Sequence, residues 1–257
     1  MDRLKELQQW SYYEFNRKLF VEPSSRHQLL IDKISDVVNT YNPRVIVKAG
    51  LGSDDLLLRL VDMFQGTIFL VVEPSWEVIS DFIQRHKDNE YIKNINFVNG
   101  DFKNFPIDYY AAHLIISIDN LDVQETAPVI EEFRRALQFD SHLLLAGIVL
   151  DDDDIDGVFD DFLRGIFPLH NDFYIREDLK TFLNLKEFSF IKGKDEFFEY
   201  SIDDIINHVR ELYGNHNFDV EQFIEDNKGT FIDLYQMNNR RVTLPYFTGL
   251  FMRRRTP

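Results

Sequence analysis

The sequence predicts an α/β fold with a seven-stranded, mostly parallel sheet, helices on both faces and additional helical cap elements. Short apolar runs alternate with stretches in which apolar residues recur every three or four positions. The first of these runs ends in a tight glycine turn, Gly50-Leu51-Gly52, and an amphipathic helix follows it. Such alternation is typical of a parallel sheet, because parallel strands are joined by crossover helices.

Seven segments have the length and composition of strands. Five lie in the first 150 residues and two near the C-terminus: 45–47, 67–72, 95–98, 113–118, 142–150, 188–191 and 242–252. Ser53 or Asp54 is predicted to cap the helix after the glycine turn, and Ser75 to cap the helix after the second strand.

No internal repeat or low-complexity linker divides the chain, so a single domain over residues 1–257 is predicted. Within it we expect a cap segment at 1–24, a core at 25–192, a helical insertion at 201–241 and the last strand at 242–252. The cap segment is rich in aromatic residues, which favours packing on the core or covering a substrate pocket.

The composition limits the partners. The chain has 44 acidic and 28 basic residues, a formal charge of −16, which argues against nucleic acids and anionic membranes as ligands. It has no cysteine, which excludes disulfides and thiolate metal sites. There is no apolar run of about 18 residues and no signal-peptide core, so a cytoplasmic location is expected. The oligomeric state cannot be predicted.

Polar residues follow the strands at their carboxyl ends, where ligands of open α/β sheets bind. The glycine turn follows the first strand, Glu73 the second, Asp101 the third and Asp119-Asn120 the fourth. This set resembles the class I S-adenosylmethionine-dependent methyltransferases, which have a Rossmann-like sheet. The resemblance covers residues 26–192 and the last strand to Met252.

The resemblance implies S-adenosylmethionine as cofactor. In that family the glycine turn lies against the methionine part, the acid after the second strand accepts both ribose hydroxyls and the aspartate after the third binds the adenine amino group. A carboxylate suits both tasks as an acceptor. The implied cofactor-binding residues are Gly50, Leu51, Gly52, Glu73, Pro74, Asp101, Phe102 and Asp119.

The implied reaction is methyl transfer to a small-molecule acceptor by positioning for in-line displacement. Asp119 and Asn120 are candidate catalytic residues, and His170 is a candidate base. Tyr12 and Tyr13 are candidate substrate contacts. The insertion at 201–241 is expected to choose the substrate, because variable lobes do so in that family. The acidic composition and aromatic N-terminus favour a small, partly apolar or cationic acceptor.

Two positions depart from the family pattern. Lys48 stands two residues before the first glycine, where the family usually has an acid, and Asp54 stands where a third glycine is common. Either Lys48 pairs with Asp54, Asp55 or Asp101, or the chain is a catalytically degenerate binding or assembly protein on this scaffold.

Two further alternatives are weaker. An NAD(P)-binding oxidoreductase would need a third glycine where Asp55 stands, and that carboxylate would meet the pyrophosphate. Asp119, Asn120 and Asp151 are similar in arrangement to the site of metal-dependent O-methyltransferases of catechol type. However, a run of aspartates such as 151–154 is typical of a solvated helix cap, so no metal is predicted.

Overall fold

The structure is a computed structural model, and it describes residues 2–16, 18–20, 24–214 and 217–255 except for the side chains of Ser24 and Asp54. The described residues form one seven-stranded sheet in the order β3-β2-β1-β4-β5-β7-β6. The strands are β1 (Val45–Ala49), β2 (Ile68–Glu73), β3 (Ile95–Asn99), β4 (Ala112–Ile118), β5 (Leu137–Ile148), β6 (Phe188–Ser201) and β7 (Arg241–Arg253). β7 runs antiparallel to both of its neighbours, β5 and β6, and the other described strand pairs are parallel. The predicted fold class is therefore confirmed.

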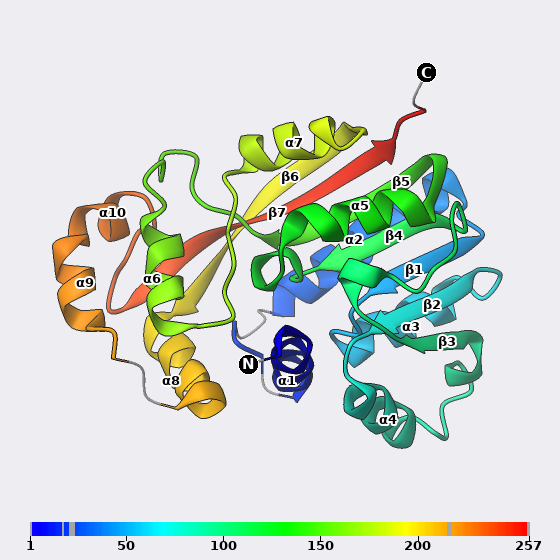
Figure 1. Cartoon of the computed structure of the whole chain (residues 1–257), viewed down its shortest axis with the longest axis horizontal. Coiled ribbons are helices and arrows are strands. Elements are labelled where there is room, and N and C mark those ends of the chain that lie inside the picture. The colour runs from blue at the N-terminus through cyan, green and yellow to red at the C-terminus, as the bar shows by residue number, and fades with distance from the viewer. Residues whose placement is uncertain (1, 17, 21–23, 215–216, 256–257) are drawn as a thin grey trace.

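Helices surround this sheet (Figure 1). In the described residues they are α1 (Arg3–Asn16), α2 (Ser24–Tyr41), α3 (Asp54–Met63), α4 (Trp76–Arg85), α5 (Thr126–Ala136), α6 (Val158–Ile166), α7 (Arg176–Leu185), α8 (Ile202–Tyr213), α9 (Val220–Asp226) and α10 (Lys228–Asp233), with short 3-10 turns η1 (Ile92–Asn94), η2 (Phe102–Asn104) and η3 (Leu121–Val123). Figure 1 shows α6, α8, α9 and α10 gathered in a lobe, with α1 between this lobe and α4. No helix in the described ranges has the length and apolar character needed to cross a membrane.

The central strands are apolar because both of their faces are covered. In β1, Ile46 belongs to one buried cluster and Val47 to another, since successive side chains of a strand point to opposite faces. The first cluster includes Trp10 of α1 and Leu57 of α3, and the second includes Phe133 of α5. The helices therefore cover both faces of the sheet, and α1 is part of the core rather than an appendage.

The residues predicted to cap α3 and α4 behave differently in the structure. Ser75 caps α4 as predicted, because its hydroxyl accepts a hydrogen bond from the amide of Val78 at 3.3 Å. Ser53 occupies the N-cap position of α3, but its side chain accepts no capping hydrogen bond. Ser53 therefore has the predicted N-cap position but does not make the predicted capping hydrogen bond.

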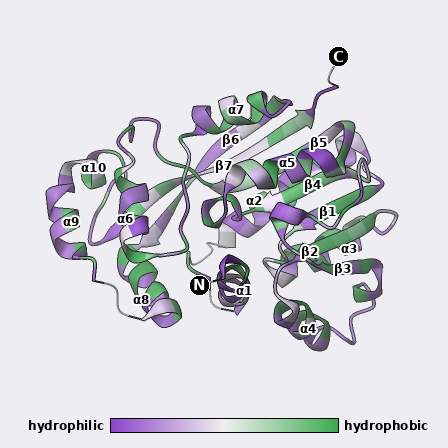
Figure 2. Ribbon diagram, viewed as in Figure 1, coloured by the Kyte–Doolittle hydropathy of each residue, from purple (hydrophilic) through white to green (hydrophobic). Residues whose placement is uncertain are grey.

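The strand predicted near 188–191 is much longer in the structure. β6 continues to Ser201 because it pairs along its whole length with β7. It is an edge strand with most side chains at least partly exposed, and its charged residues obscure the strand pattern. Figure 2 shows β6 as more hydrophilic than the central strands. Similarly, β5 starts at Leu137, before the predicted start at 142.

The order of the strands creates a switch point between β1 and β4. These strands are neighbours, although β2 and β3 come between them in the sequence. A crevice opens at the carboxyl ends of strands where the order reverses in this way. Gly50 follows β1 and Asp119 follows β4, so both lie at this crevice.

One buried carboxylate holds the helical lobe together. Asp154 accepts hydrogen bonds from the amides of Val158 and Phe159 at 2.8 and 3.1 Å, and from the hydroxyl of Tyr235 at 2.5 Å. It therefore caps the start of α6 and ties it to the segment after α10.

We expect Asp154→Ala to lower the free energy of unfolding by about 2–4 kcal/mol, because it removes a helix cap and leaves a buried hydroxyl without its acceptor. Urea unfolding measures this change. Asp153→Ala, at the exposed neighbouring position, is the matched control and should change stability by less than about 0.5 kcal/mol. Equal effects of the two substitutions would contradict the assignment.

Candidate functional site

Two cavities lie at the switch point and share part of their walls. The larger has a volume of about 740 Å³ and the smaller about 600 Å³, measured to include their open mouths. Both are lined by Trp10, Glu14, Arg26, Asp119 and Asn120. The smaller cavity also contacts the glycine turn, and the larger one extends towards β5, β7 and the segment 172–174. Ligands bound in the two cavities would therefore be neighbours.

The glycine turn forms one wall of the smaller cavity. Gly50 and Gly52 have φ angles of +74° and +59°, a region that residues with a Cβ rarely adopt. A Cβ on Gly50 would also lie 3.1 Å from Oδ1 of Asn120. Asn120 is itself held by a hydrogen bond from its side-chain amide to the carbonyl of Ala49 at 2.9 Å. Asn120 thus supports the turn from below.

Glu73 closes β2 and is the buried acceptor at the centre of the smaller cavity. One carboxylate oxygen accepts from the amide of Leu51 at 2.9 Å, and the other from the amide of Ser75 at 2.9 Å. The hydroxyl of Ser11 in α1 also donates to the second oxygen. Burial raises the pKa of Glu73, and these three donors act against that rise. Glu73 consequently links the glycine turn, the start of α4 and α1.

Lys48 lies beneath the glycine turn and is 2% exposed. Its ammonium donates to the carbonyl of Gly50 at 2.7 Å, and a Cβ on Gly52 would lie 3.1 Å from Nζ. Its charge lowers the pKa of Glu73, so the two groups interact favourably. The predicted pairing with Asp54 concerns a side chain outside the described residues. The described contacts of Lys48 include a backbone carbonyl and a neighbouring buried carboxylate.

Helix α1 covers the crevice because several side chains anchor it there. The side-chain amide of Gln8 donates to the carbonyl of Pro74 at 3.2 Å, and the guanidinium of Arg3 donates to the carbonyl of Val123 at 2.8 Å. The guanidinium of Arg85 in α4 lies 4.4 Å from the ring centre of Phe15. These contacts bring Trp10 and Glu14, one helical turn apart, into both cavities.

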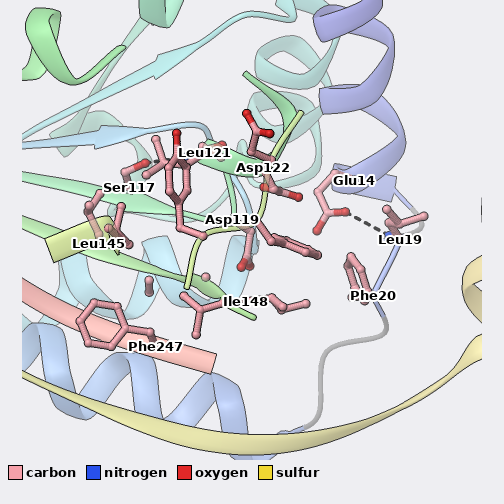
Figure 3. Close-up of a pocket in the computed structure, with 18 of the residues that line it drawn as sticks. Glu14, Leu19, Phe20, Ser117, Asp119, Leu121, Asp122, Leu145, Ile148 and Phe247 are labelled. Atoms are coloured by element: carbon pink, nitrogen blue, oxygen red, sulfur yellow. Dashed lines mark hydrogen bonds between the residues drawn. The ribbon is translucent and has the colours of Figure 1, made fainter. Parts of the chain in front are cut away.

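Acidic groups gather where the two cavities meet (Figure 3). Asp119 has a positive φ of 52° and forms an ion pair with Arg26 of α2. Burial, followed by the charge of Asp119, raises the pKa of Glu14 to about 7. The same two causes raise the pKa of Asp122 well above its usual range. Ionisation of Glu14 and Asp122 at the junction of the cavities is therefore costly.

Three residues named from the resemblance as cofactor contacts do not line either cavity. Asp101 caps η2 and accepts from the amide of Lys103 at 3.1 Å. Phe102 is buried in the core against Phe105. Pro74 contributes its carbonyl to Gln8 of α1. By contrast, Gly50, Leu51, Gly52, Glu73 and Asp119 all line the smaller cavity.

The tyrosines proposed as substrate contacts also lie elsewhere. Tyr12 is exposed on the outer side of α1, and Tyr13 packs edge-on against His208 of α8. Their role as substrate contacts stays a prediction, although neither residue lines a cavity. Trp10 and Glu14 line the cavities, whereas Tyr12 projects to solvent and the buried ring of Tyr13 is directed towards α8.

His170 lies in the loop after α6. It is 8% exposed, and its Nε2 lies 2.6 Å from Oδ1 of Asp160. The same oxygen accepts from the amide of Phe173 at 2.7 Å. These contacts hold the loop after α6, and His170 lines neither cavity. The role of His170 as a catalytic base stays a prediction, and in this structure the residue lies outside both cavities.

The helical insertion at 201–241 was expected to choose the substrate. No described residue of this segment lines either cavity. The larger cavity is bounded instead by α1, the loop 172–174 and β7. Sequence reasoning missed Trp10, Glu14, Arg26 and Asp122. The sequence shows that Trp10 and Glu14 are four residues apart, but it does not show that α1 packs over the cavities.

The aspartate run serves the lobe rather than the cavities. Asp154 caps α6, and Asp152 forms an ion pair with Arg176 at 2.6 Å. Among the described residues, no group of three or more histidine, aspartate or glutamate side chains has an arrangement that could hold a metal ion.

Comparison with solved structures identifies the fold. YcgJ from Bacillus subtilis matches with a TM-score of 0.69 at 15% identity, over 88% of this chain and 99% of that chain. The geranyl diphosphate C-methyltransferase from Streptomyces coelicolor A3(2), solved with Mg²⁺, geranyl diphosphate and S-adenosyl-L-homocysteine, matches with a TM-score of 0.63 at 11% identity over 98% of both chains. The [4+2]-cyclase SpnF matches with a TM-score of 0.60 at 13% identity, over 88% of this chain and 82% of that one.

These neighbours establish that the chain has the fold of class I S-adenosylmethionine-dependent methyltransferases, as the resemblance predicted. No family model and no curated protein sequence matches the chain. At these identities the comparison defines the fold alone, and a cyclase among the neighbours illustrates that one fold carries different activities.

We expect Glu14→Gln to raise the free energy of unfolding at pH 8 by about 1–3 kcal/mol. The native state binds the Glu14 proton more tightly than the unfolded chain, so stability is lost as pH rises from 4.5 to about 7 and the loss is complete above that range. Glutamine keeps an acceptor for the amide of Leu19, which donates to Glu14 at 3.0 Å.

Urea unfolding at pH 4 and pH 8 checks this pH dependence. The stabilising effect should vanish at pH 4, where Glu14 is protonated in both states. Asp153→Asn makes the same charge change at an exposed position and should show little effect at either pH. An equal effect of Glu14→Gln at both pH values would show that ionisation of Glu14 is not the cause.

Proposed function

We propose that this protein is an S-adenosylmethionine-dependent methyltransferase acting on a small molecule. The smaller cavity would hold the cofactor, and the larger cavity the acceptor. The observation that carries the proposal is the buried carboxylate of Glu73 beside a left-handed glycine turn at the switch point of a methyltransferase-type sheet. The cavities share walls, which methyl transfer requires because donor and acceptor must meet.

The residues of the smaller cavity fit the nucleoside part of the cofactor. Glu73 already accepts a hydroxyl donor, that of Ser11, and a ribose hydroxyl is a donor of the same kind. The carboxylate therefore has the right chemistry, but Ser11 must release it before a ribose can bind. Asp101 lines neither cavity, so it would reach the adenine amino group, as the resemblance implies, only if the cofactor extended beyond the smaller cavity. Cofactor binding thus requires a local shift of α1.

Lys48 is the residue that most needs compensation. Its ammonium is buried near the position expected for the methionine part, where it would oppose a sulfonium or ammonium group. The carbonyl of Gly50 and the carboxylate of Glu73 offset its charge, which supports a working site with an altered charge pattern. The carboxylate of the methionine part would be a favourable partner for Lys48.

Bound S-adenosylmethionine would supply an electrophilic methyl group on a sulfonium. The residues of this chain would contribute positioning and exclusion of water. Asn120 fixes the glycine turn, while Trp10 and Phe20 help to close the larger cavity. Glu14, with a pKa of about 7, is placed to accept a proton from an acceptor group near neutral pH.

One observation favours a second candidate function. Glu73 is occupied by Ser11, and Lys48 replaces the usual acid, which is the pattern expected of a binding protein that no longer takes the cofactor. The larger cavity would then be its ligand site. Titration with the cofactor distinguishes the two functions.

We expect Ser11→Ala to tighten the binding of S-adenosylhomocysteine by roughly three- to tenfold, because a net hydrogen bond of about 0.5–1.5 kcal/mol no longer competes for Glu73. Calorimetric titration measures the affinity. Glu73→Gln should weaken binding by tenfold or more, since an amide offers one acceptor oxygen in place of two.

Tyr12→Phe changes the neighbouring exposed residue of α1 and should leave the affinity unchanged. Tighter binding in Tyr12→Phe as well would mean that general loosening of α1, rather than Ser11, is responsible. Absence of binding at millimolar ligand in both the wild type and Ser11→Ala would reject the methyltransferase proposal in favour of the binding protein.

A further inference from the structure

The larger cavity is a space that the side chains of the protein leave open. Its walls are mainly apolar and come from α1, β5, β7 and the loop 172–174. Leu145 is 3% exposed, Phe173 7% and Phe247 2%, so the walls are fixed parts of the core. The space between these walls, open mouth included, is about 740 Å³. The cavity therefore suits a ligand with an apolar body.

The charges around the cavity are unbalanced. Four carboxyl groups line it, those of Glu14, Asp119, Asp122 and Asp172. Asp119 is paired with Arg26 and Asp172 with Arg164. Within the described residues, no lysine or arginine forms an ion pair with Glu14 or Asp122. Figure 3 shows Glu14 and Asp122 on the same side of the pocket as Asp119.

The pKa shifts of Glu14 and Asp122 indicate which ligand charge the cavity would favour. Burial and the neighbouring Asp119 raise the pKa of both groups, whereas Arg26 acts in the opposite direction on both and Lys18 on Glu14. The pKa values of both carboxyls remain raised despite these cations. A further positive charge in the cavity would act against both shifts, and an anionic ligand would enlarge them.

We propose that the larger cavity binds small molecules with an apolar body of about one aromatic ring and a single protonated amine, held by Glu14 and Asp122. The inference rests on the proposed function and deepens it: the amine would be the methyl acceptor after it has given a proton to Glu14, or it would stand next to the acceptor atom. A metal ion is a poorer match, since the walls are apolar and no metal-holding group of side chains occurs in the described residues.

The proposal is tested by calorimetric titration of the full chain without cofactor, using 2-phenylethylamine, 2-phenylethanol and phenylacetate. These probes share a ring and differ in charge. We expect the amine to bind at least tenfold more tightly than the alcohol, and the carboxylate more weakly than the alcohol. At pH 7 in buffers of different ionisation enthalpy, amine binding should release protons, because the bound cation lowers the pKa of Glu14 and Asp122. The alcohol should release none.

Two variants assign the effect to the named groups. Asp122→Asn and Glu14→Gln should each weaken amine binding tenfold or more and leave alcohol binding within twofold. Asp153→Asn, at an exposed site, should change neither. Proton release by the wild type does not depend on any variant folding correctly, so the test stands even if one variant is unstable.

Equal affinities for the amine and the alcohol, or no amine binding at millimolar concentration, would overturn the amine site. Failure of the methyltransferase proposal has a different signature. The amine would then bind with proton release, but S-adenosylhomocysteine would not bind to the wild type or to Ser11→Ala.

Discussion

The arrangement of this molecule depends on the hydrogen bonds that converge on Glu73. A buried carboxylate is stable only when donors surround it, and here the donors come from three separate elements. The amide of Leu51 fixes the glycine turn, the amide of Ser75 fixes the start of α4, and the hydroxyl of Ser11 fixes α1. Removing one donor would leave the others to hold a buried charge. Glu73, the proposed ligand-binding carboxylate, therefore also holds α1 over the crevice.

The sheet could be predicted from the sequence because its signals are local. Apolar runs marked the central strands, and the strand ends placed Gly50, Glu73 and Asp119 at one edge. The extent of β6 could not be predicted, because its pairing with β7 is a non-local contact and its edge position tolerates charged residues. The cap at Ser75 could be predicted from the sequence. Ser53 has the residue type and the position of a cap but makes no capping hydrogen bond.

The candidate site was less predictable because α1 contributes to the walls of both cavities. The sequence indicated an aromatic helix but not which face would dock, so Tyr12 and Tyr13 were chosen and Trp10 and Glu14 were missed. His170 was a reasonable candidate by residue type, yet its contact with Asp160 makes it part of a loop. Arg26 and Asp122 have no motif around them. Their role follows only from the tertiary arrangement that brings them to Asp119 and Glu14.

Because α1 borders both cavities, the two sites are coupled in this account. A ligand that displaces Ser11 also moves Trp10 and Glu14, and by thermodynamic linkage a ligand held by Glu14 alters the affinity of the crevice. The cap is thus neither a passive cover nor a separate domain. Through α1, a ligand in one cavity would change the affinity of the other cavity for its own ligand.

If α1 and a nucleoside compete for Glu73, hydrogen–deuterium exchange with and without S-adenosylhomocysteine should reveal the competition. The account predicts slower exchange at the turn 50–53 and faster exchange across 3–16, because the ligand replaces Ser11 on the carboxylate. Slower exchange at the turn with unchanged or slower exchange in α1 would contradict it, since the helix would then bind together with the ligand.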